Sequence, residues 1–146
     1  MNIKNHTSEM PPAKSLGLIE ELLVEAGASN INKEFRDKMP YSISFLMPHK
    51  GETLAFRLTS RQDAVFRLLW KKVKKPQNGT MAAYEAQAWR TAWKNIYDLV
   101  AAQIAILLTE QASSVELFLP YLLDKNNAKT FAERLEEDGQ LKKLLT

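Results

Sequence analysis

A long apolar stripe between residues 89 and 107 constrains the fold of this chain more than any other sequence feature. Its members recur at steps of four, three, four, four and three residues, and they are Trp89, Trp93, Ile96, Val100, Ile104 and Leu107. A helix with about 3.6 residues per turn places all of them on one side. The sequence therefore predicts a long amphipathic helix, capped at its start by Thr80, whose stripe packs into the core.

Two segments of alternating apolar and polar residues predict a β-hairpin. Residues 41–45 and 54–58 place apolar side chains at every second position, which is the period of a strand with one buried face. The Pro-His-Lys-Gly sequence at residues 48–51 is typical of the turn between them. A weaker strand near residues 30–35 would complete a three-stranded sheet, about the smallest that is stable with a helix against it.

Capping residues and helix breakers mark two helices that flank this sheet. Ser15 is a candidate cap for the first, and Gly27 is placed to end it. The second is expected to begin at Ser60, with Asp63 in the capping-box position, and to stop before Pro76. We expect the second helix to turn four apolar residues inward, namely Val65, Leu68, Leu69 and Val73.

Two further capping boxes predict short helices near the C-terminus. Ser113 with Glu116, and Thr130 with Glu133, each place an acid three residues after a hydroxyl. The helix that begins after Thr130 is expected to break at residues 138–139.

Together these elements predict an α+β protein. Helices pack on one face of a small three-stranded antiparallel sheet, in the order α-β-β-β-α-α plus short C-terminal helices. Residues 1–14 are polar and end near two prolines, so we expect them to form a flexible leader. Residues 15–146 are expected to form a single domain.

The composition limits the class of protein. A hydrophobic content of 45% with 25% charged residues is typical of a globular domain, and the absence of cysteine excludes disulfides and sulfur-ligated zinc. The N-terminus has no apolar signal segment. The longest apolar run, from Leu99 to Leu108, is about half of the roughly 20 residues that a membrane span needs. We expect a cytoplasmic protein that does not enter a membrane.

Little in the sequence points to catalysis. His6 and His49 are the two imidazole groups, neither lies in a catalytic motif, and both are expected to be exposed. The chain has no metal-ligand motif and no glycine-rich phosphate loop, and the acidic run at residues 136–138 is typical of a solvated surface. Paired carboxylates from distant positions would leave no pattern, so an enzyme stays open as a third interpretation. We expect a non-enzymatic protein without a cofactor or a metal ion.

Positive charge is concentrated in the middle of the chain. Residues 57–94 carry nine basic and two acidic residues, a net charge of +7, whereas the segments before and after them are mildly acidic, at −1 and −3. Basic residues that converge can contact several phosphates of a nucleic acid. The candidate nucleic-acid-binding residues are Arg57, Arg61, Arg67, Lys71, Lys72, Lys74, Lys75, Arg90 and Lys94. The alternative is a solvated helix face that the acidic C-terminal part balances.

Helical spacing and aromatic residues add to this hypothesis. Arg67, Lys71 and Lys74 fall at steps of four and three, so we expect them on one face of a helix. Aromatic rings in the same part of the chain could stack on single-stranded bases, and they belong to Trp70, Tyr84, Trp89, Trp93 and Tyr97. The apolar stripe favours the core for Trp89 and Trp93.

The C-terminal part of the chain, residues 87–146, resembles a known family. The stretches QAWRTAWKNIYDLVAAQIAILL, VELFLPYLL and TFAERLEEDGQLKKLL are similar to a family of small uncharacterised proteins carried by phages, prophages and mobile elements. Such a resemblance implies an origin and carries no catalytic residue. It points to two classes, accessory proteins of DNA replication or recombination and small inhibitors of host factors.

Two hypotheses about function follow from the sequence. The first is a small non-enzymatic accessory protein that binds nucleic acid through its basic residues. The second is a protein-interaction module, an inhibitor or adaptor, that binds an acidic partner or forms a homodimer through its long helix.

Overall fold

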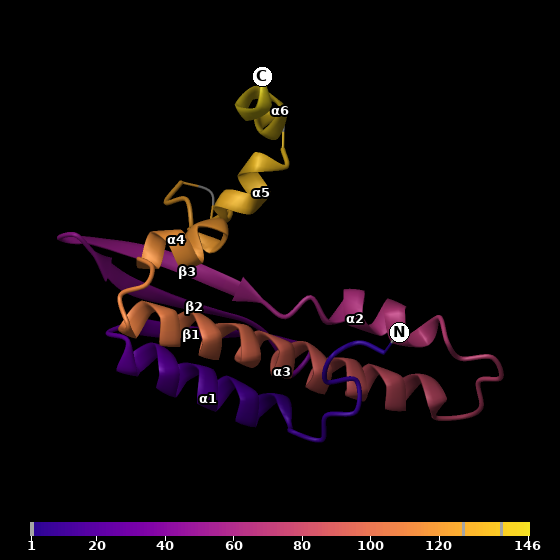
Figure 1. The fold of residues 1–146 in the computed structure, drawn as a ribbon. Helices are drawn as coiled ribbons and strands as arrows, with labels where there is room; N and C mark the ends of the chain where they lie inside the picture. Colours follow the sequence, from indigo (N-terminus) through magenta and orange to yellow (C-terminus); the bar gives the residue numbers. More distant parts are fainter. Residues whose placement is uncertain (1, 127, 138) are drawn as a thin grey trace.

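The computed structural model describes residues 2–126, 128–137 and 139–146 and confirms the predicted α+β class (Figure 1). Its sheet has the strand order β1-β2-β3, and helices come before and after the sheet in the predicted order along the chain. The elements are α1 (Pro12–Glu25), β1 (Ser29–Arg36), β2 (Met39–His49), β3 (Glu52–Thr59), α2 (Gln62–Trp70), α3 (Thr80–Leu108), α4 (Ser114–Phe118), the 3-10 helix η1 (Leu119–Tyr121), α5 (Phe131–Leu135) and α6 (Gln140–Leu145).

The predicted hairpin is present, but its turn is tighter than expected. β2 pairs antiparallel with β3 from Ser42 to His49, and Phe45 lies opposite Phe56. The turn consists of Lys50 and Gly51 alone, both at positive φ. Two residues at positive φ form the loop that best matches the twist of a hairpin. The sequence prediction was therefore wrong in placing Pro48 and His49 in the turn, because both belong to β2.

The third predicted strand, β1, forms one edge of the sheet. It pairs antiparallel with β2, and its register shifts twice, between Ser29 and Asn32 and between Glu34 and Phe35. Seven of its eight residues are exposed. Lys33 reaches α1, where it forms an ion pair with Glu20 at 3.0 Å.

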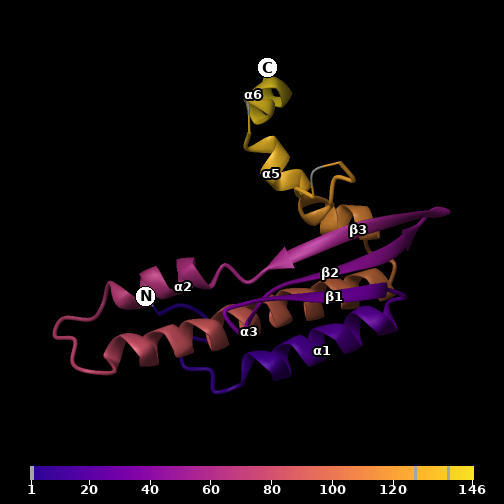
Figure 2. The same cartoon turned by 180° about the vertical axis from the view of Figure 1, so that it is seen from behind.

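The core lies between the sheet and the two helices α1 and α3, which run side by side (Figures 1 and 2). The predicted stripe on α3 is confirmed, since Trp93, Val100 and Ile104 are buried and the other stripe residues pack against them. The Trp93 indole donates a buried hydrogen bond of 2.9 Å to the carbonyl of Pro40. This bond satisfies the ring N–H where water cannot reach it.

The short helix α4 covers the end of the core near the hairpin. Phe118 is fully buried, and its ring centroid lies 5.7 Å from that of Phe45 and 5.6 Å from that of Phe56. After η1 the chain runs along the outer edge of β3. There the amide of Leu123 donates to the carbonyl of Ala55 at 2.8 Å, and Phe56 pairs with the residue before Leu123.

Two of the predicted helix caps are wrong. Helix α1 begins earlier than expected, at Pro12, so Ser15 lies inside it, fully buried, and its Oγ has no hydrogen-bond partner among the described residues. Helix α2 begins later than expected, at Gln62, after Arg61 in a left-handed conformation with φ 49°. Ser60 is 5% exposed and its Oγ likewise has no partner in the described part of the chain. Both serines are buried by packing instead of capping a helix.

Two other predicted boundaries shift as well. Gly79, at φ 84°, is the N-cap of α3, and Thr80 is the first helical residue, its Oγ1 accepting a hydrogen bond from the amide of Gln77. Helix α2 ends at Trp70, well before the expected stop at Pro76.

Helix α2 is not buried as the sequence suggested. All nine of its residues are described and none is fully buried. Val65, Leu69 and Val73 are half-buried, whereas Leu68 is 41% exposed. The helix packs on the N-terminal half of α3 and lies away from the sheet (Figure 1).

The C-terminal helices begin as predicted. Both capping boxes form, with Ser113 and Thr130 each accepting from the amide of the acid three residues later. From η1 onward α5 and α6 extend away from the rest of the molecule (Figure 1). The predicted break at residues 138–139 falls partly outside the described residues, because Asp138 is one of those left out.

The N-terminal segment, residues 2–11, lies against α3, in contrast to the expected flexible leader. The Asn5 side chain donates to Asn95 Oδ1 and Asp98 Oδ2, each at 2.8 Å. The Asn5 carbonyl accepts from Thr91 Oγ1 at 2.8 Å. These bonds fix the segment along one side of the long helix.

Candidate nucleic-acid interface

Three of the nine candidate residues, Arg57, Arg61 and Arg67, line one groove of about 830 Å³. Its floor includes Leu58 of β3 and Ile96 of α3, and α2 forms one wall while η1 and α5 form the other. Arg57 lies near the end of β3, Arg61 at the start of α2 and Arg67 in its second turn. The fold thus brings together residues that span ten positions of the sequence.

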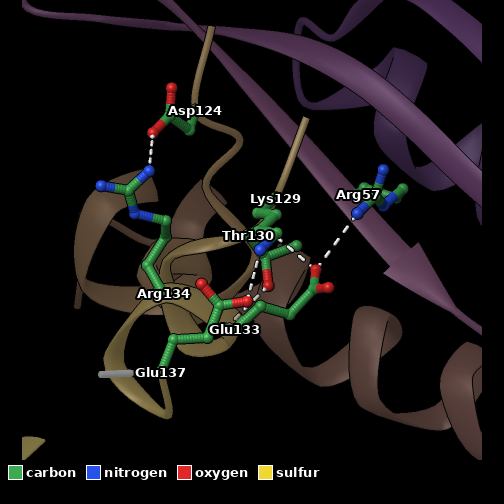
Figure 3. A network of polar contacts seen from close by, with 7 residues as sticks. All are labelled: Arg57, Asp124, Lys129, Thr130, Glu133, Arg134 and Glu137. Carbon is green, nitrogen blue, oxygen red and sulfur yellow. Dashed lines mark hydrogen bonds and ion pairs between the residues drawn. The ribbon is translucent and has the colours of Figure 1, made fainter. Parts of the chain in front are cut away.

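Arg57 forms an ion pair with another residue that lines the groove, Glu133. Its guanidinium lies 3.1 Å from Glu133 Oε1, and the same oxygen accepts the amide of Thr130 to complete the cap of α5 (Figure 3). Bonds from Thr130, together with the Arg57 charge, outweigh the effect of burial and hold the pKa of Glu133 below its ordinary value. One carboxylate therefore joins α5 to β3, and the charge of Arg57 is partly neutralised.

The same figure shows two more ion pairs around α5. Arg134 contacts Asp124 at 2.7 Å, and Lys129 contacts Glu137 (Figure 3). These pairs are half-exposed, so each contributes little to stability, but together they link the helix to the loop before it.

The other arginines of the groove differ in their partners. Arg67 forms an ion pair with Asp63 at 3.1 Å along α2. Arg36 forms one with Glu34 at 3.1 Å and lies over the ring of Tyr41 at 3.5 Å. The side chain of Arg61 is exposed and makes no ion pair or hydrogen bond with any described residue. Of the four, Arg61 alone has its charge uncompensated within the described part of the chain.

Four of the basic residues lie at and beyond the end of α2, namely Lys71, Lys72, Lys74 and Lys75. Lys71 is the C-cap of the helix, and Lys74 and Lys75 follow in the connection to α3. Lys71 still lies one helical turn after Arg67, whose carbonyl accepts its amide at 3.2 Å, but Lys74 lies beyond the helix, so the predicted stripe does not extend to Lys74.

These lysines are exposed and differ in their contacts. Within the described residues, the side chains of Lys71, Lys74 and Lys75 form no ion pair or hydrogen bond. Lys72 donates to Asn2 Oδ1 at 3.3 Å. No acidic residue occurs between Asp63 and Glu85, so no neighbour in sequence neutralises this segment.

Arg90 and Lys94 belong to α3, line no part of the groove and make their contacts within the fold. Arg90 donates from Nε to the carbonyl of Ser8 at 3.2 Å. Lys94 forms an ion pair with Asp98 at 2.7 Å and lies over the ring of Tyr97. Burial acts to raise the pKa of Asp98, but the bonds from Lys94 and Asn5 outweigh it and lower that pKa below its ordinary value. Both basic side chains thus serve the fold.

Some of the predicted stacking residues form a cluster that the sequence did not reveal. The Trp70 ring stacks on Phe66 at 5.7 Å between centroids and meets the edge of Tyr84 at 5.8 Å. All three rings are half-buried, and Trp70 directly precedes Lys71 in the sequence. Trp93 is fully buried and Trp89 packs against the core, so these two are core residues as the stripe indicated.

The two histidines are less exposed than expected. His6 is half-buried with Nδ1 2.9 Å from the carbonyl of Ile3, and His49 is half-buried with Nδ1 3.2 Å from Ser114 Oγ. These contacts join distant parts of the chain or depend on the fold of the N-terminal segment, so no sequence pattern could reveal them.

The described residues contain neither a cluster of metal ligands nor a membrane-spanning helix. Within the described residues, no three His, Cys, Asp or Glu side chains lie close enough to hold a metal ion. None of the described helices combines the length and the apolar character of a membrane span.

Comparison with known proteins adds no assignment. No protein-family model, curated protein or solved structure matches this chain. The resemblance of residues 87–146 to phage and mobile-element proteins therefore stays a prediction, and function must be argued from the residues themselves.

Proposed function

We propose that this protein is a non-enzymatic accessory protein that binds nucleic acid through the α2 side of the molecule. The observation that supports this best is the segment after α2, where Lys71, Lys74 and Lys75 are exposed and form no ion pair with any described residue. Long basic side chains that have no structural partner are the ones that can neutralise phosphates and release counterions.

The contribution of the nine candidate residues is unequal in this proposal. Lys71, Lys74, Lys75 and Arg61 are the principal phosphate contacts, because their charges are uncompensated within the described residues. Lys72 and the ion-paired Arg67 and Arg57 extend this surface. Arg90 and Lys94 are excluded from it, because Arg90 holds the N-terminal segment at Ser8 and Lys94 pairs with Asp98.

The aromatic cluster on α2 and the start of α3, in the same part of the chain as the lysines, favours single-stranded over double-stranded nucleic acid. Phe66, Trp70 and Tyr84 are half-buried, so each presents part of its ring to solvent. An aromatic ring beside a positive surface can stack on an unpaired base, whereas the bases of a duplex are already stacked on one another.

The test is binding to labelled single-stranded and duplex DNA and RNA, measured by fluorescence anisotropy. We expect single strands to bind best, with an affinity that falls steeply between about 50 and 200 mM salt. Lys71→Glu with Lys75→Glu is expected to abolish binding, and the slope of log K against log salt is expected to fall by about two for the matching neutral pair Lys71→Gln and Lys75→Gln.

The matched control is Lys142→Glu with Lys143→Glu on α6. It changes the net charge by the same amount at two exposed lysines that lie on a different part of the molecule. We expect this control to retain most of the binding. Equal losses in both double variants would show that net charge alone attracts the nucleic acid, and unchanged binding in the first would overturn the proposed surface.

A second candidate function, a protein-interaction module, rests on the surface of α6. Leu141, Leu144 and Leu145 are 47%, 67% and 78% exposed, on a helix that extends away from the core (Figure 2). Exposed leucines grouped on one short helix are typical of a surface that a protein partner covers. The stripe on α3 is buried within the chain, so a homodimer through that stripe would need the core to open.

Light scattering distinguishes self-association through α6 from the alternatives. A dimer that Leu144→Ser with Leu145→Ser converts to a monomer would support this candidate. A monomer at high concentration would leave only a different protein as the partner.

A further inference from the structure

We propose that a cavity between the N-terminal segment, α2 and α3 binds a small amphipathic anion, a molecule with one acidic group on an apolar body. The cavity has a volume of about 460 Å³, which is within the range of small-molecule sites in proteins. It shares no lining residue with the arginine-lined groove, and it does not depend on the proposed binding of nucleic acid.

The walls of this cavity are held in place by hydrogen bonds. Gln87 and Arg90 of α3 both donate to the carbonyl of Ser8, at 3.1 and 3.2 Å, and so fix the N-terminal segment to the helix. His6 Nδ1 lies 2.9 Å from the carbonyl of Ile3. Since a carbonyl can only accept, Nδ1 carries the proton in this contact and Nε2 is left as the other polar atom of the ring.

The charges that line the cavity are all positive. Lys72 and Arg90 are the two basic residues of the lining, and no Asp or Glu occurs among the eleven described residues that line it. Arg90 uses Nε for the Ser8 carbonyl and one Nη2 hydrogen for Gln87 at 2.7 Å. A guanidinium has five N–H donors, so three remain for a ligand. An anion is the ligand charge that this lining stabilises.

The rest of the lining is largely apolar. Ile3, Leu68 and Leu69 contribute aliphatic side chains, and Leu68 is 41% exposed although it belongs to a helix that packs on α3. The Tyr84 ring adds an aromatic wall, and its hydroxyl makes no hydrogen bond with any described residue. An apolar body against these side chains would bury Leu68, and an acidic group could accept from the Tyr84 hydroxyl.

The test uses octanoate and octyl phosphate as ligands and isothermal titration calorimetry as the measurement. We expect saturable binding of one molecule of at least one of them, and the tighter of the two identifies the acidic group. Octanamide has the same apolar body without the charge, and acetate has the charge without the body. Neither of these is expected to bind, because the lining needs both parts of the ligand.

Two substitutions locate the site. Lys72→Met keeps the length of the side chain without its charge and is expected to weaken binding about tenfold or more, as loss of a charged hydrogen bond does. Tyr84→Phe removes the free hydroxyl alone and is expected to weaken binding less. Lys142→Met on α6 is the control, with no expected effect, because Lys142 lies outside the cavity.

Several outcomes would overturn the inference. Absence of binding by both anions, equal binding of octanamide, or equal losses in Lys72→Met and Lys142→Met would each do so. The result is also separable from the proposed function, because Lys71→Glu with Lys75→Glu changes no residue of the cavity. That double variant should bind the anion normally even though it no longer binds nucleic acid.

Discussion

The long helix α3 passes through two regions that are held together in different ways. We call residues 62–87 the arm, in which α2 packs on the first part of α3, and the part of the fold around the sheet the body. In the body, from Ala88 onward, α3 carries seven buried residues. In the arm, whose residues are all described, none is fully buried. Helix α3 is therefore part of the packed core in the body, whereas in the arm α3 and α2 are at most half-buried.

Basic residues follow the same division. In the body Arg57 and Lys94 form ion pairs with Glu133 and Asp98, and each is about one quarter exposed. In the arm Lys71 and Lys75 are exposed and form no ion pair in the described chain. A basic side chain that the fold does not use is available to a ligand, which is why the proposed interface lies on the less buried region.

The largest expected effect compares one tryptophan from each region. Trp93→Ala removes a fully buried ring and its bond to Pro40, and we expect a loss of about 3–5 kcal/mol in the free energy of unfolding. Trp70→Ala in the arm is expected to lose less than half of that, because the ring is half-buried. Urea denaturation followed by circular dichroism measures both. Equal losses would show that the arm is as tightly packed as the body.

A smaller effect separates a serine or threonine that caps a helix from one that does not. Thr130→Ala removes the cap of α5 and should cost about 1 kcal/mol of stability. Ser60→Ala, at the junction of body and arm, should cost almost nothing or stabilise the fold, because its buried Oγ has no partner among the described residues. Thermal unfolding distinguishes the two. A clear loss in Ser60→Ala would mean that the hydroxyl has a partner after all.

Acid pH is expected to weaken two ion pairs of the body, those of Glu133 and Asp98. The pKa values of Glu133 and Asp98 are lowered by folding from ordinary values of 4.5 and 3.8. The unfolded chain therefore binds more protons, so their contribution is present above these ordinary values and is lost as the pH falls through the lower values of the folded state. Unfolding measured from neutral to acid pH should show a loss that Asp98→Asn with Glu133→Gln makes shallower.

The smallest effect concerns single lysines. Lys94→Met removes an ion pair of the body and should lower the unfolding temperature slightly. Lys71→Met in the arm should leave it unchanged, because its side chain has no hydrogen bond or ion pair to lose within the described residues. Differential scanning calorimetry under low salt, where ion pairs are least screened, gives the best chance of resolving the two. Equal shifts in the unfolding temperature would show that a lysine with an ion pair and one without contribute equally to stability.

Patterns of short range predicted much of this fold. The alternation around Phe45 and Phe56 gave both hairpin strands, since the period of two is a property of the strand itself. The capping boxes at Ser113 and Thr130 were also predicted, because all the atoms that form them lie within four residues.

Where more than one residue is suited to begin a helix, the sequence did not show which one does. Ser15 and Ser60 have the residue type of a cap, yet Pro12 begins α1 and Arg61 precedes α2, because packing of the serines against the core decides the helix start. The candidate interface depends on contacts between distant residues. Arg57 meets Glu133 76 positions away, and no pattern in the sequence reveals such a pair.

The two edges of the sheet are finished in different ways, and this bears on how the protein behaves at high concentration. On β1 the edge carries the charged residues Lys33, Glu34 and Arg36 and two shifts of register. At β3 the edge is partly occupied by the chain itself, through the bond from Leu123 to Ala55. Charge and irregular backbone on one side, and an internal occupant on the other, discourage another molecule from adding a strand. We therefore expect the sheet to resist fibril formation and strand exchange, even if α6 brings molecules together.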